Sequence, residues 1–306
     1  WENSFLGYPT VDQGCGLAQG GCYQHFQHGS IYWTASTGAH FVRGGIRDYW
    51  AASGWENGRY GYPKTDELCR TGTGGTLCRQ DFQGGTIKWR SGIGIIDCSR
   101  LKCVALTFDG GPSPYTGELL DTLDARNVQV TFFVVGQYID GNPAVVKRAH
   151  TNGNEVMNHS WSHPCLIDNC PSAPTQGPIS STEIRSQLER TSDKIQATVG
   201  ERPTMLRPPF GEYDQRLLDI SRAEGLAVVN WSADTIDWRD QNTAIIRERA
   251  VTKATSGGII LMHDTMPTTI AAVPGIISDL KARGYVLVTV GDVIGHPVPG
   301  VFYTHG

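Results

Sequence analysis

The first third of the chain contains a sequence that occurs twice. The segment WENSFLGYPTVD at residues 1–12 recurs as WENGRYGYPKTDE from Trp55, 54 positions later. The segment CYQHFQHGSIYW at residues 22–33 recurs as CRQDFQGGTIKW at residues 78–89, 56 positions later, so the second copy has two extra residues in the Gly-rich stretch at 71–76. A module this short and rich in glycine buries only a small core. The repeat therefore predicts a small N-terminal unit of two similar modules.

The chain has eight cysteines, which occur as four pairs that are close in sequence. An even count in short local pairs predicts disulfides, and with them an oxidising compartment. The alternative is a structural zinc site, but the chain has no Cys-x-x-Cys pair and its spacings are too wide for the usual zinc ribbons. Each repeat keeps its own pair, and a local disulfide suits a module with a small core. The expected pairs are Cys15–Cys22, Cys69–Cys78, Cys98–Cys103 and Cys165–Cys170.

Length and charge narrow the class of protein. A chain of 306 residues is long for one compact domain and comfortable for two. The net charge is −4 and no long Lys/Arg run occurs, which argues against a nucleic-acid partner or an anionic membrane surface. No apolar run approaches the ~20 residues of a transmembrane helix. The chain starts at Trp1 rather than at Met, so we expect a mature or trimmed form.

The N-terminal repeats resemble a known repeat family. Segments FQHGSIYW and FQGGTIKW have the β-branched and aromatic content of strands after a turn, and GGIRDYWAASG between the copies predicts a short helix. The stretches LGYP at 6–9, GSIYW at 29–33 and GAHFVRG at 38–44 are similar to the LGFP repeat of secreted actinobacterial proteins. The resemblance implies a tandem repeat domain over residues 1–96, with copies at about 1–54 and 55–96, that binds a cell-wall component. A spacer that binds nothing is the alternative.

After residue 97 the pattern changes to alternating strands and helices, which favours a mainly parallel α/β sheet, doubly wound or closed as a barrel. The strand-like runs lie at 103–108, 128–135, 155–158, 227–231, 258–262 and 285–290. The helical stretches lie at 117–126, 144–152, 181–199, 214–224, 244–255 and 269–283. In such folds the chemistry gathers at the carboxyl ends of the strands.

Five segments at expected strand ends carry reactive side chains. LTFDGGPSPYT places Asp109 at a strand tip, where a carboxylate acts as a general base if it is held ionised, or merely caps a turn. HSWSH places His159 and His163 at i and i+4, one helical turn apart, so that both imidazoles can reach one metal ion. LRPPFGEYD supplies Arg207, which can hold a carboxylate bidentately, and a stiff loop of prepared N–H donors.

The fourth and fifth segments pair carboxylates with a histidine. NWSADTIDW contains Asp234 and Asp237, and ILMHD ends an apolar strand at His263. A buried carboxylate beside a histidine raises its pKa and fixes its tautomer, which suits a general acid. A pair of ordinary polar residues at strand ends is the alternative.

Together, and in this order, the five segments resemble the motifs of the polysaccharide deacetylases of the NodB homology type, carbohydrate esterase family four. The resemblance spans about residues 98–296. It implies a distorted (β/α) barrel as the catalytic domain at 97–306, a divalent metal with zinc as the expected ion, and deacetylation of chitin, chito-oligosaccharide, peptidoglycan or acetylated xylan. It further implies that His159 and His163 are metal ligands, that Asp109 is the general base and that Arg207 orients it.

The same resemblance assigns the remaining roles. His263 would protonate the leaving group, with Asp234 tuning it. The backbone N–H of Phe210 would help to hold the oxyanion, and Trp231 and Leu261 would line the acetyl pocket. The expected partner is an N-acetylated glycan, and the expected location is secreted or cell-wall associated.

One position departs from the family pattern. The first motif of the family usually contains Thr-Phe-Asp-Asp-Gly, whereas this chain has Thr107-Phe108-Asp109-Gly110-Gly111. The second Asp is the third metal ligand of the family, and Gly110 has no side chain to replace it. Water, another carboxylate or reduced catalysis are the open outcomes. We expect N-deacetylation; an acetylxylan-type O-acetyl esterase and a non-catalytic glycan-binding protein are the alternatives. The loop at 164–178, closed by Cys165 and Cys170, either shapes the substrate groove or is a stapled surface insertion.

Overall fold

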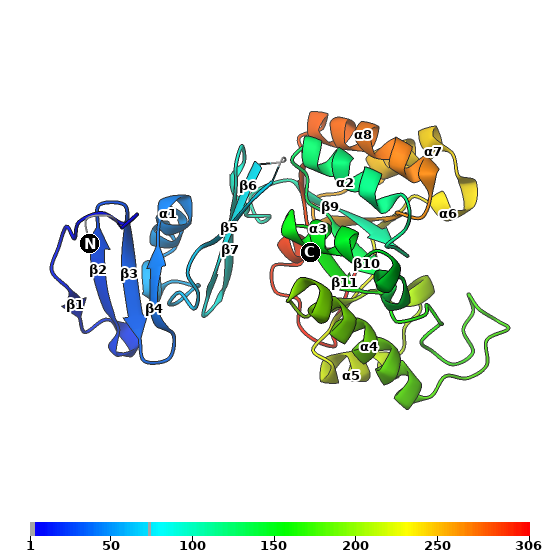
Figure 1. Cartoon of the computed structure of the whole chain (residues 1–306), viewed down its shortest axis with the longest axis horizontal. Coiled ribbons are helices and arrows are strands. Elements are labelled where there is room, and N and C mark those ends of the chain that lie inside the picture. The colour runs from blue at the N-terminus through cyan, green and yellow to red at the C-terminus, as the bar shows by residue number, and fades with distance from the viewer. Residues whose placement is uncertain (1–3, 73–74) are drawn as a thin grey trace. The chain divides into compact units, whose positions relative to one another are not determined.

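A computed structural model of the chain describes residues 4–72 and 75–306. The chain divides into two compact units, Trp1–Asp97 and Cys98–Gly306 (Figure 1). Each unit is described by itself below.

The first unit contains one four-stranded antiparallel sheet per repeat. The first sheet has the order β1 (Gly14–Cys15), β2 (Cys22–Phe26), β3 (Gly29–Thr34) and β4 (Gly38–Val42), with a short 3₁₀ turn at Ala18–Gly20. Helix α1 (Gly44–Ala52) and a 3₁₀ turn at Trp55–Asn57 lead into the second sheet, β5 (Leu68–Gly72), β6 (Gly75–Phe82), β7 (Gly85–Arg90) and β8 (Gly94–Ile95). The predicted strands and helix of the repeats are confirmed. Both repeats share one core, in which the largest buried residues are Tyr32, Ile46, Trp50, Tyr62, Phe82 and Ile87.

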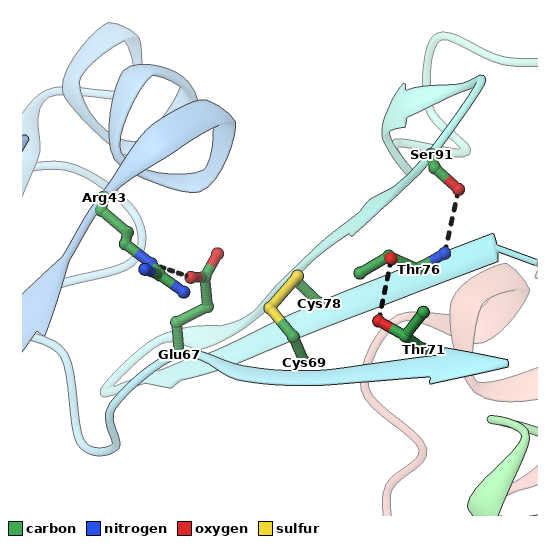
Figure 2. The surroundings of a disulfide bond; sticks show 7 residues. All are labelled: Arg43, Glu67, Cys69, Thr71, Thr76, Cys78 and Ser91. Carbon is green, nitrogen blue, oxygen red and sulfur yellow. Dashed lines mark hydrogen bonds and ion pairs between the residues drawn. A yellow bond between two sulfur atoms is a disulfide. The ribbon is translucent and has the colours of Figure 1, made fainter. Parts of the chain in front are cut away.

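All four predicted disulfides are present, and no free cysteine remains among the described residues. Within each repeat the cysteines are direct partners on adjacent antiparallel strands, so each disulfide joins the first strand of a sheet to its second. Figure 2 shows Cys69–Cys78, together with the 2.6 Å contact from Arg43 Nε of the first repeat to Glu67 Oε2 of the second. The staple and this ion pair support a unit whose core is small.

The second unit is built on a curled parallel sheet. Its path runs β14 (Ala233–Asp234), β15 (Gly258–His263), β9 (Cys103–Asp109), β10 (Thr131–Val134), β11 (Glu155–Asn158), β12 (Met205–Leu206), β13 (Ala227–Val229) and β17 (Phe302–Tyr303), while β16 (Val286–Val288) pairs with the beginning of β9. Every pairing in this sheet is parallel. The predicted mixed α/β class with a distorted barrel is confirmed.

Helices and short turns connect these strands. The helices are α2 (Thr116–Ala125), α3 (Pro143–Thr151), α4 (Ser181–Val199), α5 (Gln215–Ala223), α6 (Asp237–Asp240), α7 (Thr243–Thr252), α8 (Pro267–Ala282) and α9 (Val290–Ile294), with 3₁₀ turns at Gly136–Gly141 and Pro209–Gly211. In Figure 1, α2 and α8 lie side by side over the sheet, in agreement with their packing contacts. Strand β9 is buried along its whole length, as expected for a strand near the middle of a covered parallel sheet.

Most predicted elements lie where the sequence pattern placed them. Helix α4 begins after Ser180, whose side chain accepts the N–H of Glu183, and ends before Gly200 at φ +83°. The strand expected at 285–290 is shorter, because Thr289 and Asp292 form a capping box that starts α9. Over residues 4–72 and 75–306, no helix has the length and apolar character that a membrane crossing requires.

Candidate active site

Four strand ends bring predicted reactive residues to one edge of the sheet. Asp109 is the last residue of β9, and it is the direct register partner of His263 at the end of the neighbouring β15. On the other side of β9, β10 and β11 lead to Asn158 and then to His159. Strand β12 ends one residue before Arg207. Parallel strands place their carboxyl ends at the same edge, and the register confirms that shared location.

Asp109 is held by Arg207. Both side chains are almost fully buried, and Arg207 Nη1 donates to Asp109 Oδ1 at 2.8 Å. Burial raises the pKa of Asp109, and the Arg207 charge opposes part of that rise. Arg207 fixes the direction of this carboxylate through Oδ1 and leaves its second oxygen for other contacts. That oxygen, Oδ2, lies 3.9 Å from Nε2 of His159.

Arg207 does not grip Asp109 bidentately, which corrects our expectation. Three other N–H groups of Arg207 donate to Thr107 Oγ1 at 2.6 Å, to the carbonyl of Val229 at 3.1 Å and to the carbonyl of Asn230 at 2.8 Å. The guanidinium therefore ties β9 to the end of β13. Three of its five N–H donors serve backbone and hydroxyl oxygens, and a single donor serves the carboxylate.

His159 and His163 face each other, but the segment that carries them is not a helix. Residues 159–163 form a loop in which Ser160 and His163 have φ of +63° and +62°. This backbone brings the two ring centroids to 4.9 Å. The expected helical geometry is wrong, but the two imidazoles lie close together as predicted.

The loop is fixed by a residue that sequence reasoning missed. Gln187 of helix α4 is buried, and its Oε1 accepts the N–H groups of both Trp161 and Ser162 at 2.9 Å. Gln187 is one of the polar residues on the inward face of an amphipathic helix, which is the only trace of its role in the sequence.

Both imidazoles suit a metal site. His159 Nδ1 is 2.7 Å from the carbonyl of Arg207, so Nδ1 carries the proton and Nε2 keeps its lone pair. Burial lowers the pKa of His159 to about 3 and that of His163 to about 4, which keeps both rings neutral at neutral pH. Neutral imidazoles with an oriented second nitrogen are the usual ligands of zinc.

Position 110 adds no donor to these two rings. Gly110 has φ +89°, and a Cβ built there would meet only the Thr265 methyl, at 3.5 Å. Beside this loop, Oδ1 of Asp264 is buried and makes no hydrogen bond. Asp264 packs against Gly111 and accepts from Thr116 Oγ1 at 2.5 Å, so it belongs to the wall of this loop. The donor set therefore fits a divalent metal through two imidazoles and lacks the carboxylate that the family pattern puts at 110.

Among the described residues, the one tight group of three potential ligand atoms lies elsewhere, at Glu67, Cys69 and Cys78. Both of these thiols are consumed by a disulfide (Figure 2), so the group is not a metal site.

His263 is paired with Asp237, and not with Asp234 as we expected. Asp237 Oδ1 lies 2.8 Å from His263 Nδ1, and Asp237 Oδ2 accepts the backbone N–H of His263 at 2.7 Å. The side chain of Asp234 instead accepts the N–H of Ile236 at 2.7 Å, two residues along the chain. Ile236 has φ +54°, and the change in chain direction at this residue places Asp237 beside His263. Asp234 acts on His263 only through its charge, as the smallest of the groups that raise the pKa of His263.

The pair has complementary electrostatics. Burial works against the charged form of His263, but the hydrogen bond and charge of Asp237 outweigh it and raise the pKa of His263. Burial likewise opposes the ionisation of Asp237, and the hydrogen bonds from His263 and Thr269 outweigh it and lower the pKa of Asp237. Thr269 Oγ1 donates to Asp237 Oδ2 at 2.6 Å. No motif in the sequence singles out Thr269, which lies in helix α8.

The residues expected around the acetyl group lie at the same edge. Phe210 has φ +63°, and its ring centroid is 4.9 Å from that of His163. The Trp231 ring packs so closely on Gly211 that a Cβ there would meet it at 2.7 Å. Leu261 is buried in β15, two residues before His263. Their roles at the oxyanion and acetyl pocket remain predictions.

Comparisons with known proteins agree with this arrangement. The family profile described as Polysaccharide deacetylase matches residues 97–229, and the profile described as LGFP repeat matches residues 6–58 and 61–95. Peptidoglycan-N-acetylglucosamine deacetylase PgdA of Listeria monocytogenes is 37% identical over 195 residues, which are 63% of this chain and 39% of that protein. The chain thus spans well under half the length of that relative.

Two solved structures extend the comparison. The structure of T48 deacetylase with substrate has a TM-score of 0.62 and 32% identity, and the match covers 68% of this chain and 99% of that one. A mutant of a CE4 family pseudoenzyme, described as having restored enzymatic activity, has a TM-score of 0.57 and 29% identity over 64% of this chain and 68% of that one. The chain contains a curled parallel α/β sheet with a carboxylate–arginine pair and a histidine–carboxylate pair at one edge. It belongs to the polysaccharide deacetylase family, carbohydrate esterase family four, and carries LGFP repeats in front.

Proposed function

We propose that this chain is a metal-dependent hydrolase that removes N-acetyl groups from a glucosamine-containing glycan: peptidoglycan, chitin or chito-oligosaccharide. One observation carries the proposal: Asp109 and His263 are register partners on adjacent strands. Asp109, held by Arg207, is the proposed base, and His263, held by Asp237, is the proposed acid. The name of the Listeria relative, a peptidoglycan deacetylase, supports a wall glycan as the substrate.

The two pairs divide the proton transfers of amide hydrolysis. Asp109 takes a proton from the attacking water through Oδ2, while Arg207 holds Oδ1 and keeps the carboxylate oriented. Water oxygen bonds to the acetyl carbon, the C–N bond breaks, and His263 gives its Nε2 proton to the departing nitrogen. Asp237 keeps the proton of His263 on Nδ1, so Nε2 is the atom that faces the glycan. Acetate and a free amine are the products, and each catalytic group contributes roughly 10²–10⁴-fold.

His159 and His163 would hold the metal through their neutral nitrogens, with zinc as the preferred ion for this ligand type. A divalent cation there supplies Lewis-acid polarisation of the acetyl carbonyl and of water. The backbone N–H of Phe210 would share the developing negative charge on the carbonyl oxygen, and Trp231 and Leu261 would enclose the methyl group.

The N-terminal unit would direct the enzyme to its polymer. We propose a repeat domain over residues 1–96 and a catalytic domain over residues 97–306, with the repeats binding a cell-wall component. Four disulfides, LGFP repeats and a wall-deacetylase relative support a secreted or cell-wall-associated protein.

Acetate release from an N-acetyl chito-oligosaccharide tests the proposal. Chelator-treated protein is assayed with and without added Zn²⁺, next to the His263→Ala variant. We expect release only with metal and a loss of roughly 10²-fold or more in the variant. Release from an O-acetylated xylan alone would replace the amide substrate by an ester.

A second function is favoured by one observation, the glycine at position 110. A chain without this carboxylate could retain glycan binding and lack catalysis, and a CE4 family pseudoenzyme is among the similar structures. No acetate from any substrate, together with activity in Gly110→Asp, would establish this non-catalytic function.

A further inference from the structure

The two repeats hold one tyrosine each in the same local geometry. Tyr8 and Tyr62 occupy equivalent places in the GYP turns of the first and second copy. The N–H of Tyr8 donates to Gln27 Oε1 at 3.1 Å, and the N–H of Tyr62 donates to Gln83 Oε1 at 3.0 Å. The following proline bridges to the equivalent phenylalanine in both copies. Each repeat therefore holds the backbone of its tyrosine through a glutamine side chain of the same repeat.

The surroundings of these two tyrosines differ completely. Tyr62 is 0% exposed, whereas Tyr8 is 52% exposed. Tyr62 is covered by the first repeat: its hydroxyl donates to the carbonyl of Ala18 at 2.6 Å, and its ring lies 6.4 Å from that of Tyr32. The indole N–H of Trp50 completes this seam by donating to the carbonyl of Gly61 at 3.0 Å. A large aromatic side chain that is buried in one copy and half exposed in the other marks an uncovered interface.

The surface that covers Tyr62 consists of the hairpin turn and strands of the first repeat and of helix α1. The second repeat offers no such surface. At the positions equivalent to Tyr23, His25 and Tyr32 it carries Arg79, Asp81 and Lys88. After β8 the chain proceeds to Cys98 and β9 instead of forming a counterpart of α1. Charged replacements at the outer face are typical of a terminal, capping repeat.

The first repeat has no comparable replacement on its opposite face. It keeps Tyr8 and the Trp-Glu-Asn sequence at 1–3 that corresponds to Trp55–Asn57. In the second copy, Trp55 stacks on Tyr32 at 6.0 Å and meets Trp50 edge-on at 5.2 Å. Trp1, its counterpart, lies outside the described residues.

We propose that the Tyr8 face of the first repeat is a docking surface for another LGFP-type repeat, which covers Tyr8 as the first repeat covers Tyr62. The argument is the seam between the two copies, which shows the complementary surface in atomic detail. A second molecule of this chain does not fit, because its covering surface is already occupied by its own Tyr62 and its outer face is charged. The repeats of this protein are then one end of a longer stack, closed at the second repeat and open at the first.

A fusion of residues 1–54 ahead of the full chain tests the proposal, because Gly54 then meets Trp1 as it meets Trp55 in the chain. The added donor repeat carries Tyr8→Phe, so that its peptide differs in mass from that of the acceptor. Hydroxyl-radical oxidation reports the exposure of the acceptor Tyr8. In the unfused chain Tyr8 should react like Tyr138, which is 46% exposed. In the fusion its rate should fall at least about fivefold, toward that of buried Tyr62, because oxidation follows exposed area.

The matched control is a fusion whose donor also carries Tyr23→Arg, His25→Asp and Tyr32→Lys. These residues occur at the same places in the second repeat, which folds with them. Tyr8 should stay reactive in this control. Equal reactivity of Tyr8 in the unfused chain and the first fusion, with the donor disulfide intact, overturns the proposal. Concentration-dependent protection of Tyr8 in the unfused chain also overturns it, in favour of a second molecule of the chain.

Discussion

Replacing Asp237 by Asn tests which carboxylate serves His263. The amide keeps the size of the side chain and an oxygen for the Nδ1 proton, but it removes the charge and turns an NH2 toward the two donors that Oδ2 accepts, the backbone N–H of His263 and the hydroxyl of Thr269. One carboxylate oxygen lies 2.8 Å from Nδ1, so the change converts a charge-assisted hydrogen bond into a neutral one. Hydrogen bonds to charged groups contribute about 1.5–3 kcal/mol, which corresponds to a loss of roughly 10- to 150-fold in kcat/KM.

The pH profile separates this role from a structural one. A general acid acts while protonated, so activity falls as the pH rises through its pKa. Asp237 raises the pKa of His263 in the folded protein. The Asp237→Asn variant should therefore lose activity on the alkaline side at a lower pH than the parent does. Acetate release is measured from pH 5 to pH 10, with circular dichroism to confirm folding.

Asp234→Asn is the matched control, because Asp234 bonds to the backbone of Ile236 and reaches His263 only through its charge. Its kcat/KM should change by less than about threefold. An equal loss in both variants, or an alkaline limb that Asp237→Asn leaves in place, would refute the assignment.

Three further perturbations follow from the same geometry. Gly110→Asp should tighten Zn²⁺ binding by at least about tenfold in calorimetry, because a direct ligand contributes more than the 10–100-fold effect of outer-shell partners. An unchanged affinity would mean that position 110 does not face the metal. Arg207→Lys should cost about 3–5 kcal/mol in urea unfolding, because Lys cannot replace four buried hydrogen bonds and Asp109 loses its partner; a cost below 1 kcal/mol would contradict this. Burial raises the pKa of Asp264 to about 6, so the folded state binds a proton that the unfolded state has lost, and stability falls by about 3 kcal/mol as the pH rises from 4 to above 6. Asp264→Asn should remove this pH dependence in unfolding curves at pH 4 and pH 7.5. An unaltered dependence would show that another group causes it.

The sequence predicted the scaffold well, because local patterns determine it. Alternation of apolar runs with amphipathic stretches located the strands and helices of the second unit, and helix α4 has the predicted limits. The repeat offset and the cysteine spacing identified the disulfides, since adjacent antiparallel strands bring such neighbours together.

The site was predicted only as far as strand ends determine it. Asp109, His159, Arg207 and His263 meet there because parallel register brings their strands to one edge. The carboxylate that serves His263 depends instead on one backbone reversal at Ile236, which the spacing of residues does not reveal. Likewise the geometry of the two histidines depends on two positive φ values within a loop, where a helical spacing rule has no meaning.

The amide of Gln187 has a consequence for anyone who would transplant this chemistry. One oxygen on helix α4 receives both N–H groups at the middle of the histidine loop, so the loop has its shape only while the helix stands behind it. A graft of the five residues HSWSH onto another parallel sheet would carry the two imidazoles without the Gln187 hydrogen bonds that hold the loop in shape. The smallest unit that could be transferred to another protein is therefore the loop together with one turn of a helix about 25 positions later in the chain. A library built on this scaffold should vary Gln187 and the loop jointly.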